Sequence, residues 1–216
     1  SGYHTLRINA GDAYGEATLI CAPASIPVPK AVADRQRWGW MAQMYSVRSA
    51  ESWGVGDYGD LRHLLKDAAE KTHADFMLIN PIHACAPIPP LEPSPYLPES
   101  RRFLNVTYIR PQDIAEYADL SESDKAEVAR LHAQVSAAND DVNPMDINSA
   151  WCHKRQALKI IFRQPRSVER QSAFERFKEQ AGPDLKAFAA WSVAFEVWGA
   201  PWETSWFNDT NRDSPE

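Results

Sequence analysis

The alternation of apolar and polar residues at the start of the chain predicts a β-hairpin. Two extended segments, at residues 3–9 and 16–22, flank a short polar stretch that contains glycine and aspartate, which is the pattern of two strands joined by a turn. A lone hairpin is barely stable in water, and the prolines of 23–36 suit neither a helix nor a central strand. We therefore expect residues 1–36 to be the end of a β domain, present as a hairpin remnant, followed by a linker.

The next stretch has the order strand, helix, strand, which is typical of a parallel α/β fold. The apolar residues of 38–47 and 75–80 predict two buried strands, and the second is apolar enough to be covered on both faces. Between them, leucine and alanine recur at helical spacing over 58–71, which predicts a helix. Asp57, a favoured N-cap residue, stands directly before it. We expect the strands to be parallel neighbours, and in such folds active sites lie at the carboxyl ends of the strands.

A long loop, residues 84–108, follows the second strand and contains six prolines. Loops of this length without structure of their own are uncommon and usually functional. Its polar groups surround one aromatic ring, at Ser94, Tyr96, Ser100, Arg101, Arg102 and Asn105. Such groups suit a neutral polyol, because they form hydrogen bonds with hydroxyls while the ring packs against the apolar face of a sugar. A proline-stiffened surface loop with an ordinary polar surface has the same composition, so both interpretations stay open.

From residue 121 onward the apolar spacing is that of helices. The predicted apolar faces contain Val128, Leu131 and Val135, then Trp151, Leu158, Ile161 and Phe162, then Phe174 and Phe177, and finally Leu185, Phe188 and Phe195. The second helix is expected to place Lys154, Arg155 and Lys159 opposite its apolar face, and Pro183 to open the fourth helix. We expect a helical subdomain over about 119–200, within a second domain that spans 37–216.

Composition narrows the class of protein. The 216 residues are 44% apolar, which is ordinary for a globular chain with a core. The net charge of −6 argues against a nucleic-acid or membrane-surface partner, because binding phosphate groups needs a basic face. Three cysteines without close pairing favour a reduced, cytoplasmic setting. The sequence has no apolar run of about 18 residues, and its first residues lack the pattern of a signal peptide.

Other chemical motifs are weak. The pairs His83–Cys85 and Cys152–His153 lack the regular spacing of a zinc site, and the glycines of residues 54–59 form neither dinucleotide nor P-loop motifs. No serine stands in a nucleophile elbow. We therefore expect no metal and no cofactor.

Paired carboxylates would be the signature of sugar chemistry. Asp57 and Asp60 are better explained as helix caps. Glu92 and Glu99 lie in the long loop, where carboxylates are usually solvated. None of the four is expected to be catalytic.

Several linked runs resemble one family. They occupy residues 2–6, 43–49, 53–61, 80–84, 94–96 and 100–105. These runs are similar to those of the 4-alpha-glucanotransferases, also called amylomaltases or disproportionating enzymes, which belong to the alpha-amylase clan of (β/α)8 barrels. The resemblance implies a TIM-type barrel, here only its amino-terminal part, together with the helical subdomain.

The resemblance also implies an activity and a site. Members transfer α-1,4-glucan segments between maltooligosaccharides with retention of configuration. Tyr96 matches the family tyrosine that packs against the sugar next to the scissile bond, Ser94 and Asn105 match its neighbours, and Asn80 and His83 lie in another matching run. With Arg102 of the loop, these are the expected substrate-binding residues.

The family's catalytic carboxylates lie in runs similar to Arg-x-Asp-His and Ala-Glu-Asp-Leu-Gly, and neither run occurs in these 216 residues. We therefore expect this chain alone to be an inactive amino-terminal piece, and its open strand edges to cause self-association unless it is the remnant of a longer chain. A glucan-binding module without catalysis and a helical interaction domain over 121–198 are the alternative interpretations.

Overall fold

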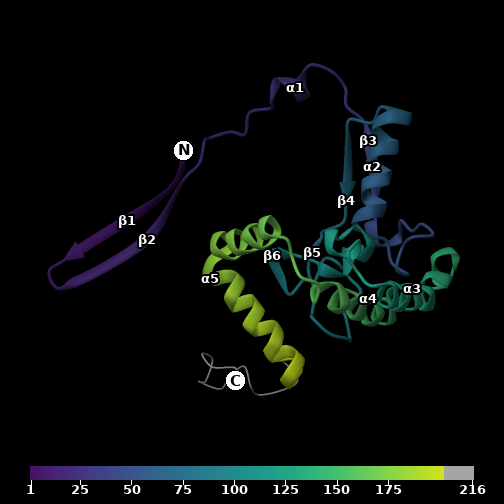
Figure 1. Cartoon of the computed structure of the whole chain (residues 1–216). Helices are drawn as coiled ribbons and strands as arrows, with labels where there is room; N and C mark the ends of the chain where they lie inside the picture. Colours follow the sequence, from purple (N-terminus) through teal and green to yellow (C-terminus); the bar gives the residue numbers. More distant parts are fainter. Residues whose placement is uncertain (202–216) are drawn as a thin grey trace. The chain divides into compact units, whose positions relative to one another are not determined.

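A computed structural model describes residues 1–201 of the chain, which divides into two units. The first is Ser1–Trp38, and the second begins at Gly39. Figure 1 shows the elements of each unit along the chain. None of the described helices combines the length and apolar character needed to cross a membrane.

The first unit contains the predicted hairpin. Strands β1 (Gly2–Ala10) and β2 (Ala13–Cys21) are antiparallel, with Ala10 opposite Ala13 at the closed end. The turn is tight because Gly11 adopts a φ of 62°, which glycine reaches without steric cost. The second strand consequently begins at Ala13 rather than at residue 16. A short helix, α1 (Lys30–Ala33), lies in the segment predicted to be a linker.

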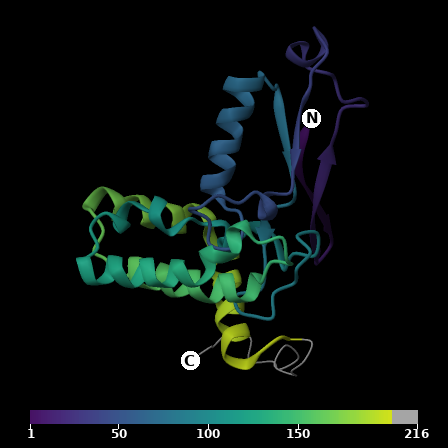
Figure 2. The same cartoon turned by 90° about the vertical axis from the view of Figure 1, so that its right-hand side faces the viewer.

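The second unit begins with the predicted strand, helix, strand order. Strands β3 (Gly39–Ala42) and β4 (Phe76–Ile79) are parallel, and α2 (Tyr58–Thr72) connects them. Figure 2 shows α2 running alongside this strand pair. The prediction of adjacent parallel strands joined by a helix is confirmed.

Two details of this pair differ from prediction. Strand β3 ends at Ala42 rather than at residue 47, because the Met44 amide donates to the side chain of Asn80 at 2.6 Å and the chain turns into the 3-10 helix η1 (Met44–Ser46). Strand β4 is not covered on both faces within the described residues, since Phe76 and Leu78 are more than half exposed.

The long loop has structure at its two ends. Strands β5 (His83–Ala84) and β6 (Ser100–Leu104) form an antiparallel pair, closed by the hydrogen bond from the Asn105 amide to the Ile82 carbonyl. The expectation of a structureless segment over 84–108 was therefore wrong, because backbone pairing joins residues far apart in the loop. Three 3-10 helices follow, η2 (Val106–Tyr108), η3 (Pro111–Asp113) and η4 (Ala115–Tyr117).

The helical region contains α3 (Glu122–Ser136), the 3-10 helix η5 (Ala137–Asp140), α4 (Ile147–Phe162) and α5 (Val168–Trp198). The third and fourth predicted helices are the two halves of α5, which is kinked at Gly182 just before Pro183. Helices α3 and α4 pack side by side (Figure 2). Their core contains Trp53, Leu120, Val128, Leu131, Val135, Ala157 and Ile161.

Candidate functional site

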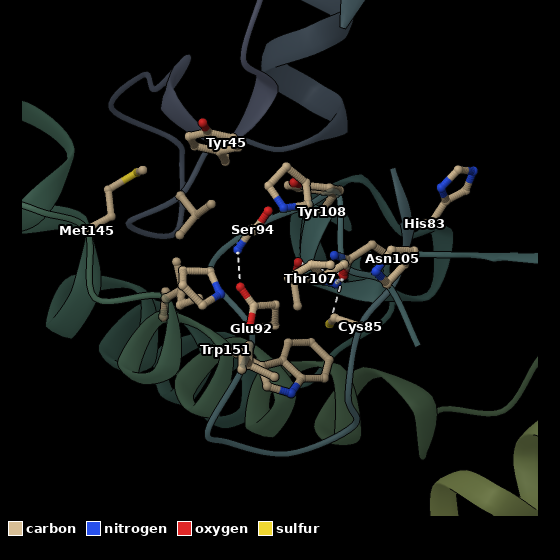
Figure 3. Close-up of a pocket in the computed structure, with 18 of the residues that line it drawn as sticks. Tyr45, His83, Cys85, Glu92, Ser94, Asn105, Thr107, Tyr108, Met145 and Trp151 are labelled. Carbon is tan, nitrogen blue, oxygen red and sulfur yellow. Dashed lines mark hydrogen bonds between the residues drawn. The ribbon is translucent and has the colours of Figure 1, made fainter. Parts of the chain in front are cut away.

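A cavity of about 280 Å³ lies where the long loop meets η2 and α4. In Figure 3, Tyr45 of η1 and Trp151 of α4 lie on opposite sides of it, with Ser94 and Glu92 between them. Its wall joins aromatic and proline surfaces to a few polar groups. This combination is typical of small-ligand sites, in which polar groups fix the orientation of a ligand that apolar surfaces cover.

Three of the six predicted site residues line this cavity, namely His83, Ser94 and Asn105. The other three lie elsewhere. The ring of Tyr96 is outside the cavity wall and 58% exposed. Arg102 forms an ion pair with Asp184 of α5 at 2.7 Å. Contacts of all six with a glucan remain predictions.

Asn80 is a buried residue just after β4, and it forms a hydrogen bond with the segment just after β3. It is 3% exposed, and its amide oxygen accepts the Met44 hydrogen bond. Its amide nitrogen donates to the Pro81 carbonyl at 2.8 Å and to the Tyr108 hydroxyl at 3.3 Å. Both ends of the amide are therefore engaged, which holds η1 and η2 beside the carboxyl end of β4.

Asn105 connects the loop to η2. Its side-chain oxygen accepts hydrogen bonds from the amide and hydroxyl of Thr107, at 2.9 and 2.7 Å, and from the Cys85 thiol at 3.3 Å. Burial raises the pKa of the Cys85 thiol to about 11, so the sulfur stays protonated and acts as a donor at neutral pH. Asn105 is thus held from two sides in the cavity wall.

Glu92 and Trp151 are cavity residues that the sequence did not assign to a site. The Glu92 carboxylate accepts a hydrogen bond from the Ser94 amide at 2.9 Å, which orients the turn carrying Ser94. The Trp151 indole donates to the Pro87 carbonyl at 2.9 Å, so α4 supports the other arm of the loop. Trp151 was predicted only as an apolar helix residue. The sequence signal for its second role was the indole N–H, because a buried tryptophan usually donates this hydrogen bond to an acceptor.

Lys154 was predicted on the polar face of its helix, and this was wrong. Its side chain is 1% exposed, and its ammonium group donates to the Thr107 carbonyl at 2.6 Å. Helical spacing explains the correction, because residues three and four positions from Trp151 and Leu158 share their face. Burial lowers the pKa of Lys154 to about 8, although Asp57 favours its charged form.

Arg110, Asp57 and Asp60 form a buried ion cluster near the start of α2. The Arg110 guanidinium bonds both oxygens of Asp57, at 2.9 and 3.0 Å, and one oxygen of Asp60 at 2.7 Å. Asp57 also caps α2 in a reciprocal arrangement with Asp60, which confirms the prediction that both are cap residues. Burial opposes ionisation of Asp60, but hydrogen bonds from Ser49, Ser52 and Arg110 outweigh it and lower its pKa.

The cavity has the mixed apolar and polar lining of a small-ligand site, but among residues 1–201 its wall holds no pair of carboxylates arranged for acid–base or nucleophilic work. Among the residues that the structure describes, Glu92 is the single carboxylate in its wall. Glu99, whose pKa is raised by burial, is not part of the wall. Within residues 1–201, no cluster of histidine, cysteine, aspartate or glutamate could hold a metal ion.

The structure thus defines an α/β fold with a cavity near the carboxyl ends of its parallel strands, and the comparison with known families identifies one family. The model of the 4-alpha-glucanotransferase family matches residues 42–216. The chain belongs to this family.

Sequence identity to individual proteins supports the same family. The chain is 40% identical over 207 residues to 4-alpha-glucanotransferases of Mycobacterium tuberculosis and Mycobacterium bovis, a match that covers 93% of the chain. It is 31% identical over 191 residues, 85% of the chain, to that of Haemophilus influenzae. It spans 28% of the length of the mycobacterial relatives and 27% of the Haemophilus relative.

The crystal structure of amylomaltase from Corynebacterium glutamicum has a similar fold, with a TM-score of 0.81 and 38% identity. The similarity covers 98% of the chain and 30% of the amylomaltase.

Proposed function

We propose that the full-length protein is a 4-alpha-glucanotransferase that transfers α-1,4-glucan segments between maltooligosaccharides with retention, in the cytoplasm. The observation that carries the proposal is the similarity of nearly the whole chain, in sequence and fold, to an amylomaltase. Residues 1–216 would then supply the amino-terminal part of a (β/α)8 barrel, whose first strands are β3 and β4, and the helical subdomain.

In this proposal the loop after β4 forms part of the glucan site. Tyr96, Ser94, Asn105, Arg102, Asn80 and His83 are the proposed substrate-binding residues. The position of the loop supports this role, because barrel enzymes build their sites from loops at the carboxyl ends of strands. The exposed ring of Tyr96 is available to pack against a sugar.

The 216-residue chain alone should not convert maltotriose. A retaining transfer needs a carboxylate nucleophile and a second carboxyl group as acid and base, and each such group contributes several orders of magnitude in rate. Glu92 is the single carboxylate that residues 1–201 place in the cavity wall. The full-length protein should transfer α-1,4-glucan segments from one maltotriose to another and release glucose, and Tyr96→Ala should lower its transfer without unfolding it.

The test is chromatography of the glucose and longer maltodextrins formed from maltotriose by both proteins. Tyr3→Ala, at an exposed aromatic residue of the first unit, is the matched control. Turnover by the short chain that is abolished by Glu92→Gln or Glu99→Gln would overturn the assignment. Calorimetric titration of the short chain with maltooligosaccharides tests the cavity separately, and tight binding without turnover in either protein would favour a glucan-binding module.

A further inference from the structure

The amide group of Asn105 has a defined orientation in the cavity wall. Its oxygen faces the Thr107 amide at 2.9 Å. Because a backbone N–H can only donate, it must face the side-chain oxygen of Asn105 and not the nitrogen. The nitrogen has no hydrogen-bond partner within residues 1–201, and the residue is half-buried where it lines the cavity. Asn105 therefore offers a ligand two N–H donors and no free acceptor.

The turn that orients Asn105 is itself held from α4. Thr107 contributes two donors to Asn105, and its carbonyl accepts the hydrogen bond from the buried ammonium of Lys154 at 2.6 Å. Figure 3 shows Thr107 beside Asn105 in the cavity, with the hydrogen bond from Cys85 drawn as a dashed line. A continuous chain of contacts thus runs from the helical region to the amide of Asn105.

Burial of Lys154 lowers the stability of the fold more than burial of an apolar side chain would, so filling space does not explain why a lysine stands here. A buried ammonium loses its hydration, and an apolar residue of similar size avoids that cost. Lys154 has no ion pair within residues 1–201. The charged groups that influence it are Asp57 and Asp60 at the start of α2, which favour its charge, and Arg110 after η2, which opposes it. Its direct hydrogen bond to the protein is the one to the Thr107 carbonyl.

We propose that Lys154 is a positioning residue, which acts through Thr107 to hold the Asn105 amide with its nitrogen as a donor to a sugar hydroxyl. The role in sugar binding rests on the proposed function, whereas the control of the Asn105 orientation does not. Asn105 is the contact residue, and Lys154 acts on the substrate only through it.

The orientation is tested on the 216-residue chain by NMR of its asparagine side-chain amides. The Asn105 signals are identified by their loss in Asn105→Asp. In Lys154→Met and in Thr107→Val these signals should shift and broaden, because the amide is no longer held in one orientation. Lys159→Met, at an exposed lysine of the same helix, should leave them unchanged. Unchanged Asn105 signals in folded Lys154→Met and Thr107→Val chains would overturn the proposal.

Transfer by the full-length protein tests the consequence. Lys154→Met and Asn105→Asp should each lower kcat/KM by about five- to tenfold, the effect of one neutral hydrogen bond. If Lys154 acts through Asn105, the double variant should be no worse than Asn105→Asp alone. Thr107→Val should also be non-additive with Asn105→Asp, although it leaves the lysine contact in place. A second substitution at the lysine itself, Lys154→Gln, removes the ammonium group and keeps the test decisive if Lys154→Met fails to fold.

The outcomes separate the two proposals. If the reductions in kcat/KM of the single variants multiply in the double variants, the residues act independently, and this would refute the positioning role of Lys154. Absence of transfer in the unaltered full-length protein would refute the proposed function, while the NMR comparison would still decide whether Lys154 controls Asn105.

Discussion

Removal of the Arg110 guanidinium should be among the most damaging single changes in the described part of the chain. The side chain of Arg110 is 2% exposed, and those of Asp57 and Asp60 are 0% and 2% exposed. In Arg110→Met, an apolar side chain of comparable length would stand beside two buried carboxylates. The variant therefore removes the compensating charge while it keeps most of the volume.

The magnitude follows from which contacts are buried. Loss of one partner of a buried ion pair costs about 3–5 kcal/mol, because the remaining charge stays uncompensated. The contact with Glu51 at 2.6 Å adds little, since that side chain is 67% exposed and surface pairs contribute about 0–1 kcal/mol. We expect the free energy of unfolding to fall by about 3–5 kcal/mol, a large part of the stability of an ordinary domain.

Urea unfolding followed by tryptophan fluorescence measures this loss, because Trp53 is fully buried in the helical core. Arg130→Met is the matched control, since Arg130 pairs with Glu127 on the surface and its loss should cost less than about 1 kcal/mol. A loss below about 1 kcal/mol in Arg110→Met would refute the reasoning that the cluster stabilises the fold.

Acidification gives an independent check on the same cluster. The lowered pKa of Asp60 means that its contribution is fully present above the ordinary value of 3.8 and is lost as the pH falls through the lower folded value. Unaltered protein should lose this contribution below that pH. The difference in stability between unaltered protein and Arg110→Met should narrow over the same range.

Three further outcomes are expected. Gly59→Ala should destabilise the chain by about 1–3 kcal/mol in urea unfolding, because an added Cβ would lie 2.4 Å from the guanidinium of Arg110; an unchanged midpoint would contradict this. Between pH 8 and 10.5 the unfolded chain binds more protons at Lys154 than the folded chain does. The free energy of unfolding of the unaltered protein should therefore rise with pH by up to about 3 kcal/mol relative to that of Lys154→Met. A difference between the two proteins that stays constant with pH would contradict this. The isolated chain should self-associate in light scattering and bind a dye for apolar surfaces, because Met41, Phe76 and Leu78 of the strand pair are exposed; a compact monomer without bound dye would contradict it.

Local patterns determined much of the fold. The paired β1 and β2, helix α2 with its Asp57 cap, and the parallel pairing of β3 and β4 could all be predicted, because alternation, capping and apolar runs act over neighbouring residues. The same holds for part of the candidate site. Ser94, Asn105 and His83 do line one cavity, since His83 and the loop that carries the other two follow directly after a predicted strand.

Tertiary structure decided the rest, because the deciding contacts join residues that are distant in sequence. Arg110 bonds Asp57 across 53 positions, and Lys154 bonds Thr107 across 47. A charged residue in a sequence is normally assigned to the surface, since burial without a partner is costly. Helical spacing places Lys154 on the face of Trp151 and Leu158, but its acceptor, the Thr107 carbonyl, was known only from the tertiary structure.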